Sequence, residues 1–283
     1  MIRSDRGRVA AFLAPAVVTL GTVTVFPMLW VVVLSLERYA LVEGPPRFVG
    51  LGNYARLAAD ERFWNAFGNT VYFTAMSVAL ELALGLAIAL FIARVKRGRS
   101  VLYALALVPW AVPTVVSARM WEWMYNADFG VLNYLTGHEF NWLGSPLLAI
   151  HAAILMDVWK ATPFVTLLLL AGLQSIPPDL YRAAAVDGAG RLTMLMRLTL
   201  PMLLPVIGVV LVFRTIDAFR VFDSVYVLTG GGPANTTEML SIYAYKLFFQ
   251  TLEFGYGSAV AMAVMLVVGL ATVVYARLLR PNL

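Results

Sequence analysis

The sequence predicts an all-α integral membrane protein, a single domain over residues 1–283 built from six membrane-spanning helices. Hydrophobic residues make up 61% of the chain and charged residues only 13%, a balance far from that of soluble domains. Each of six apolar runs exceeds the ~20 residues that a helix needs to cross ~30 Å of hydrocarbon. These runs cover roughly residues 11–36, 67–93, 101–125, 147–173, 202–228 and 258–279.

The first run follows a basic leader, as a signal peptide would. It is longer than a signal peptide core and no small-x-small cleavage pattern follows it, so we expect an uncleaved helix. Proline occurs inside three of the later runs and is expected to bend those helices. The prolines concerned are Pro109, Pro113, Pro163 and Pro205.

Basic residues gather in alternate connections between the runs. They are Arg3, Arg6, Arg8, Arg94, Lys96, Arg97, Arg99, Arg182, Arg191, Arg197, Arg277 and Arg280. The other connections are more acidic or balanced. By the positive-inside rule, both termini are therefore expected in the cytoplasm. The net charge of +5 follows this membrane topology, so it does not predict a nucleic-acid partner.

The sequence lacks the motifs that are typical of metal sites and phosphate-binding loops. The chain has no cysteine, and His138 and His151 lie in different segments, so no metal site is expected. The glycine-rich run at 227–238 has no Lys-Ser or Lys-Thr after it and no strand before it, unlike a phosphate-binding loop. We expect no catalytic residues and no cofactor bound by this chain.

A polar, alanine-rich insert lies between the fourth and fifth runs. Asp179 is expected to cap a short helix, Ala183–Ala185 favour helix, and Gly188 with Gly190 loosen its end. The insert has too few large apolar residues to bind lipid well. Its position after the fourth run predicts a cytoplasmic helix that docks into a soluble partner.

Three segments, in order along the chain, carry a family resemblance. They are Phe48–Tyr54, the Tyr181–Pro201 loop with its Asp-Gly-Ala and Leu-Pro elements, and Phe222–Pro233 with its Leu-Thr-Gly-Gly-Gly-Pro run. Together they resemble the sugar-type ABC importer permeases related to the maltose and glycerol-3-phosphate systems. The resemblance implies the six-helix core of type I importers in the cell (cytoplasmic, inner) membrane, with a cytoplasmic coupling loop at about 175–201.

The resemblance also implies a set of partners. A member of this family forms half of a pore with a second homologous permease subunit, surrounded by membrane lipid. Two ATPase subunits bind ATP and Mg, and an extracytoplasmic solute-binding protein delivers the sugar. The residues implied to contact the ATPase are Tyr181, Arg182, Ala183, Ala184, Asp187, Gly188 and Ala189. Arg182 stands where the family usually has glutamate, so we expect an acidic or neutral ATPase surface opposite it.

Charged residues also lie inside two of the apolar runs, where each costs about 2.5–3.5 kcal/mol unless it meets a partner or water. Asp157 and Lys160 share one face of the fourth run, and Arg214 and Asp217 share one face of the fifth. They could be structural ion pairs, or they could bind a hydroxyl-rich ligand. Glu81 in the second run is a further acid with no assigned partner.

The resemblance favours the ligand site, because the sugar contacts of maltose-type permeases fall on these two helices. The implied substrate-binding residues are Asp157, Lys160, Ala161, Phe164, Arg214, Asp217, Ala218 and Val221. Among the tryptophans, Trp159 is the expected stacking partner and the others are expected in the core or the interfacial belt.

The leading hypothesis is thus a non-catalytic permease subunit of an ATP-driven, binding-protein-dependent importer for a di- or oligosaccharide. One alternative is a permease of the glycerol-3-phosphate type. Another is an ion-coupled secondary transporter with protons carried by Asp157, Asp217 or Glu81, which leaves the docking insert unexplained.

Overall fold

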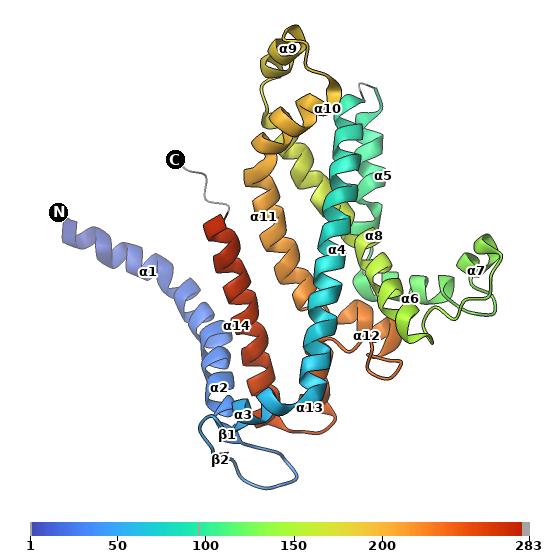
Figure 1. The fold of residues 1–283 in the computed structure, drawn as a ribbon. Coiled ribbons are helices and arrows are strands. Elements are labelled where there is room, and N and C mark those ends of the chain that lie inside the picture. Colours follow the sequence, from blue (N-terminus) through green and yellow to red (C-terminus); the bar gives the residue numbers. More distant parts are fainter. Residues whose placement is uncertain (1, 96, 279–283) are drawn as a thin grey trace. The chain divides into compact units, whose positions relative to one another are not determined.

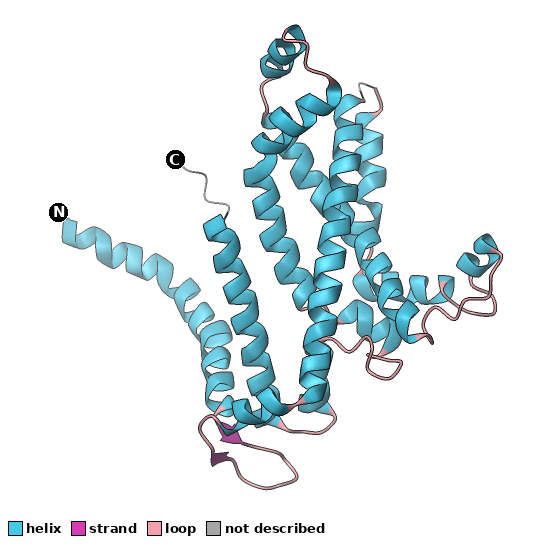
Figure 2. Cartoon of the chain, viewed as in Figure 1, coloured by secondary structure: helices cyan, strands magenta, loops and turns pink. Residues whose placement is uncertain are grey.

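The computed structural model describes residues 2–95 and 97–278, and nearly all of its regular elements are helices (Figure 2). Two compact units pack separately: Met1–Phe63 with Tyr243–Met265, and Trp64–Ile242 with Leu266–Leu283. Lys96 and Arg280, two of the basic residues in the charge pattern, lie outside the described residues.

The first unit begins with a long apolar helix in three parts. These parts are α1 (Ile2–Leu20), a π-helical turn (Gly21–Val25) and α2 (Phe26–Ser35). A two-residue antiparallel ladder of β1 (Glu37–Arg38) and β2 (Arg47–Phe48) follows, and then the short helix α3 (Gly52–Ala59). Residues 243–265, from α13 (Leu240–Phe249) and the first half of α14 (Phe254–Leu278), supply most of the rest of this unit.

Polar contacts hold the start of α3 against the end of α2. The Asn53 side chain is 6% exposed and donates to the carbonyls of Ser35 and Glu37 at 2.9 and 2.8 Å. The Tyr54 hydroxyl lies 2.8 Å from the Ser35 hydroxyl. This part of the Phe48–Tyr54 segment therefore has a structural role, because it satisfies carbonyls at the end of α2.

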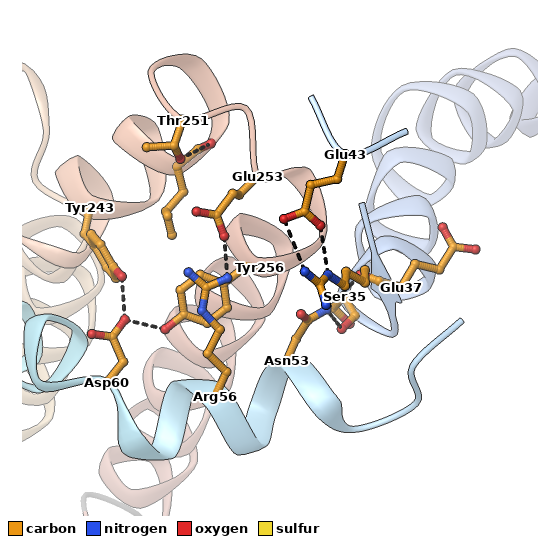
Figure 3. A network of polar contacts seen from close by, with 12 residues as sticks. Ser35, Glu37, Glu43, Asn53, Arg56, Asp60, Tyr243, Thr251, Glu253 and Tyr256 are labelled. Atoms are coloured by element: carbon orange, nitrogen blue, oxygen red, sulfur yellow. Dashed lines mark hydrogen bonds and ion pairs between the residues drawn. The ribbon is translucent and has the colours of Figure 1, made fainter. Parts of the chain in front are cut away.

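A second set of contacts joins α3 to α13 and α14 in the same unit (Figure 3). Asp60 accepts hydrogen bonds from the Tyr243 and Tyr256 hydroxyls, both at 2.5 Å, and Arg56 pairs with Glu253. Partial burial alone would raise the pKa of Asp60, but the two tyrosine hydrogen bonds outweigh it and hold that pKa below its usual value.

The second unit is a helical bundle. Its elements are α4 (Glu61–Arg94), α5 (Arg99–Ala111), α6 (Thr114–Met124), α7 (Val131–Thr136), α8 (Pro146–Ser175), α9 (Pro178–Val186), α10 (Arg191–Met194), a π-helical turn (Leu195–Thr199), α11 (Leu200–Phe219) and α12 (Asp223–Thr229). Helix α8 packs against α5 and α11, and α12 packs against α6. At Gly85 a Cβ would lie 2.6 Å from the Val165 side chain, so glycine allows α4 to approach α8 closely.

Within the described residues, five helices are long and apolar enough to cross a membrane, and α5 with α6 makes a sixth span if that bent pair counts as one. The predicted run at 101–125 is therefore not one straight helix, because α5 and α6 meet at 89°. The break falls at Val112, whose ψ of 134° is extended. A residue before proline, here Pro113, is disfavoured in the α conformation.

The predicted run at 202–228 is also too long. Helix α11 ends at Phe219, and residues 223–229 form the separate helix α12. Arg220 and Asp223 therefore lie at the junction rather than inside the spanning helix. The charge of Asp223 favours this break, because a carboxylate in the first turn of α12 complements the helix dipole.

The polar insert forms α9, which lies at one end of the second unit's bundle, while α6 and α12 lie at the other (Figure 1). Asp179 does not cap it as predicted: Pro177 occupies that place, and Asp179 pairs with Arg182 at 2.8 Å. Proline at the first helical position, Pro178, makes a side-chain cap less necessary because it has no N–H to satisfy.

Candidate functional site

Arg214 is the centre of a buried charge cluster in the second unit. Its guanidinium is 5% exposed and faces carboxylates from three helices. Glu81 on α4 accepts from Nε at 2.5 Å and from Nη2 at 2.8 Å. Asp157 on α8 accepts from Nη2 at 3.2 Å, and Asp217, one turn along α11, accepts from Nη1 at 2.5 Å. The ion pairs thus link α4, α8 and α11.

The three carboxylates differ sharply in their access to solvent. Glu81 is fully buried, Asp157 is 14% exposed, and the Asp217 side chain is 61% exposed. Glu81 and Arg214 form the desolvated part of the cluster. Two N–H···O bonds join them, and this bidentate arrangement is the strongest geometry for an arginine–carboxylate pair. Asp157 and Asp217 lie on the open side and keep oxygen lone pairs available.

Lys160 does not pair with Asp157, although the two residues share a face of α8. Its Nζ donates to the Val112 carbonyl at 2.5 Å. That carbonyl lies between the end of α5 and the start of α6, so it is outside the regular helical ladder. The break in the third apolar run therefore supplies the acceptor for an intramembrane cation.

A cavity of about 800 Å³ opens beside this cluster, within the size range of small-molecule sites. Helices α8 and α11, the α5–α6 break and the start of α12 form its walls. Its charged lining residues are Asp157, Lys160, Arg214, Asp217, Arg220 and Asp223. The Trp110 and Phe164 rings stack in its wall with centroids 6.2 Å apart and planes at 23°. The cavity thus combines hydrogen-bonding groups with flat aromatic surface.

Seven of the eight predicted substrate-binding residues line this cavity. They are Asp157, Lys160, Ala161, Phe164, Arg214, Asp217 and Val221. The exception is Ala218, which is 2% exposed and belongs to the packed core. Trp159, the expected stacking residue, packs edge-to-face against Trp121 instead.

Sequence reasoning missed two parts of the site. Trp110 and Val112 reach the cavity only because the third apolar run breaks, and the proline after Val112 was the available signal. Glu81 had no assigned partner, since its bonds to Arg214 join residues 133 positions apart.

The predicted coupling residues lie on and just after α9. Most of this segment is exposed, including Arg182, Ala183 and Asp187. Tyr181 is anchored, because its hydroxyl lies 3.0 Å from that of Thr199. Gly188 has a φ of +77°, a conformation that glycine adopts without strain. The remaining coupling residues, Ala184 and Ala189, are half-buried.

Both histidines make hydrogen bonds outside the cavity beside Arg214. The His138 ring is hydrogen-bonded to the Thr136 carbonyl, and His151 is hydrogen-bonded to Tyr72. No group of three or more histidine, cysteine or acidic side chains that could hold a metal occurs in the part of the chain that the structure describes.

Residues 82–283 match the family described as "Binding-protein-dependent transport system inner membrane component". The chain belongs to this family. The prediction of a multi-pass inner-membrane permease, rather than an enzyme, is thereby confirmed.

Relatives of this inner membrane component include the trehalose/maltose transport system permease protein MalF of Thermococcus litoralis. It is 43% identical over 272 residues, covering 90% of this chain and 92% of the relative. The trehalose transport system permease protein SugA of Mycobacterium tuberculosis is 37% identical and covers 92% of this chain and 85% of the relative.

Among solved structures, a bacterial alginate ABC transporter in complex with an alginate pentasaccharide-bound periplasmic protein matches with a TM-score of 0.86. The match covers 98% of this chain and 95% of the other at 23% identity. That similarity confirms the predicted fold, the helical permease core of type I importers.

Proposed function

We propose that this chain is the permease subunit of an ATP-driven, binding-protein-dependent importer that carries a di- or oligosaccharide. It forms one transmembrane domain with both termini in the cytoplasm. The names of the relatives, which include trehalose and maltose systems, support a sugar substrate. The family description supports dependence on a binding protein.

The single observation that carries the proposal is the cavity beside Arg214. A sugar hydroxyl both donates and accepts hydrogen bonds, so it can use carboxylates and cationic groups together. Asp157 and Asp217 accept from hydroxyls, Lys160 and Arg214 donate, and the Trp110–Phe164 pair offers a flat surface to a sugar ring. Apolar walls with a few convergent polar groups are typical of ligand sites.

The coupling role falls to α9. Most residues of this helix are exposed, and Val186 at its end is 88% exposed. In the proposed assembly this segment, about residues 175–201, docks into one of two ATPase subunits that bind ATP and Mg. The second permease subunit completes the pore, and the extracytoplasmic solute-binding protein delivers the sugar.

Asp217→Ala tests the proposed site. Because Glu81 and Asp157 still balance Arg214, the variant should assemble normally. Losing one charged partner of the ligand costs about 1.5–3 kcal/mol, so uptake in proteoliposomes should weaken at least about tenfold. Asp217→Asn, which keeps a polar group of the same shape, should lose less. Normal uptake by an assembled Asp217→Ala complex would refute the site.

A further inference from the structure

Arg214 lines the cavity, yet most of its hydrogen-bonding capacity is already used. A guanidinium has five N–H donors. The Nε donor and both Nη2 donors are taken by Glu81 and Asp157, and one Nη1 donor is taken by Asp217. A single N–H, on Nη1, remains for a ligand.

That remaining donor limits which ligand groups Arg214 can bind. A carboxylate or phosphate is recognised best by two parallel N–H groups of the guanidinium fork. Glu81 occupies the fork formed by Nε and Nη2, and Glu81 itself is fully buried and not part of the cavity lining. A ligand hydroxyl needs only one N–H, so the free Nη1 donor suits it.

The charge around the fork disfavours an anion as well. Glu81, Asp157 and Asp217 surround Arg214, and the nearby Lys160 donates to the Val112 carbonyl. Asp157 and Asp217 line the cavity, so a ligand carboxylate would lie against their acceptor oxygens. At the junction of α11 and α12, Arg220 is accompanied by Asp223 in the cavity lining.

We propose that Glu81 is a specificity-determining positioning residue: by holding the fork of Arg214, it makes the cavity selective for uncharged sugars over sugars that carry a carboxylate. The inference rests on the proposed function, because it names the substrate class of the same cavity. Glu81 acts through Arg214 and touches no ligand.

The test measures sugar binding to the assembled permease–ATPase complex in lipid nanodiscs, without the solute-binding protein, which would impose its own selectivity. Saturation-transfer difference NMR gives the Kd for trehalose, maltose and trehalose with one C6 carboxylate. The wild type should bind the carboxylated sugar at least about tenfold more weakly than trehalose. Glu81→Gln should narrow the ratio of the two Kd values by about tenfold, because the amide keeps only one acceptor oxygen and leaves one N–H of the fork without its acceptor.

Glu122→Gln is the matched control, since Glu122 pairs with the exposed Arg119 on α6 outside the cavity lining. It should leave the ratio unchanged. Asp217→Ala in the same assay separates the two proposals. If no neutral sugar binds, or if Asp217→Ala leaves the Kd for neutral sugars unchanged, the proposed function is refuted and this inference is refuted with it.

If neutral sugars bind through Asp217 but Glu81→Gln leaves the ratio unchanged, only the role of Glu81 is refuted. Equal binding of trehalose and its carboxylate by the wild type would also overturn the inference, and that measurement needs no variant. Asp157 and Asp217 still balance Arg214 in Glu81→Gln, so assembly should persist.

Discussion

Arg214 is buried in the described bundle because its charge is shared among acids on three helices. Breaking a buried ion pair by removing one member costs about 3–5 kcal/mol, since the other charge is left unpaired. The members are not equivalent. Asp217 is 61% exposed and can be solvated without Arg214, whereas Glu81 is fully buried and cannot. The Glu81–Arg214 pair is therefore the structural half of the cluster, and Asp157 with Asp217 forms the half that is open to a ligand.

Replacing Arg214 by methionine should test this division. The buried Glu81 carboxylate then loses its partner, so the yield of assembled complex after detergent purification should fall sharply. Adding Glu81→Gln should restore most of that yield, because a neutral amide tolerates burial better than an unpaired carboxylate. Adding Asp217→Ala instead should not. Normal assembly of Arg214→Met alone would show that the pair is dispensable for folding.

At the scale of elements, hydropathy predicted the helices that are regular and failed where they break. The runs at 67–93 and 147–173 fall within α4 and α8, whose apolar residues are continuous. The predicted run at 202–228 extended beyond the end of α11. Hydropathy averaged along the chain does not detect a break between two apolar helices. The faces of α8 and α11 could be predicted from helical spacing. The bond to Glu81 on α4 could not, because spacing within a helix says nothing of which helices meet.

The segment after α9 depends on one backbone conformation. Gly188 has a φ of +77°, where a β-branched residue is strongly disfavoured and asparagine is tolerated better. A Cβ there would meet nothing within 4 Å, so strain rather than a clash decides the outcome. Gly188→Val should therefore reduce uptake and substrate-stimulated ATP hydrolysis in proteoliposomes, while Gly188→Asn stays near the wild type. Equal activity of both variants would show that this turn does not serve coupling.

For the whole molecule, the membrane topology depends on whether the bent α5–α6 pair crosses the membrane. If it does, two spans separate the connection at residues 95–98 from α9, and both lie on the cytoplasmic side. If the pair turns back as a re-entrant loop, only α8 separates them and they lie on opposite sides. The positive-inside rule favours the crossing, since basic residues lie in both places. Arg97 and Arg182 are examples.

The absence of cysteine from the chain makes this testable by labelling, because there is no background thiol. Arg97→Cys, Tyr134→Cys and Val186→Cys place single thiols at exposed positions before α5, in α7 and at the end of α9. A membrane-impermeant maleimide should label Tyr134→Cys in intact cells, and should label the other two only in inside-out vesicles. Detergent-solubilised protein, in which all three should react, controls for accessibility.

Because α8 has 30 residues and spans about 45 Å at 1.5 Å per residue, Tyr134→Cys and Val186→Cys must lie on opposite faces of the membrane. Labelling of Arg97→Cys from the same side as Tyr134→Cys would contradict the crossing and make the α5–α6 pair a re-entrant loop.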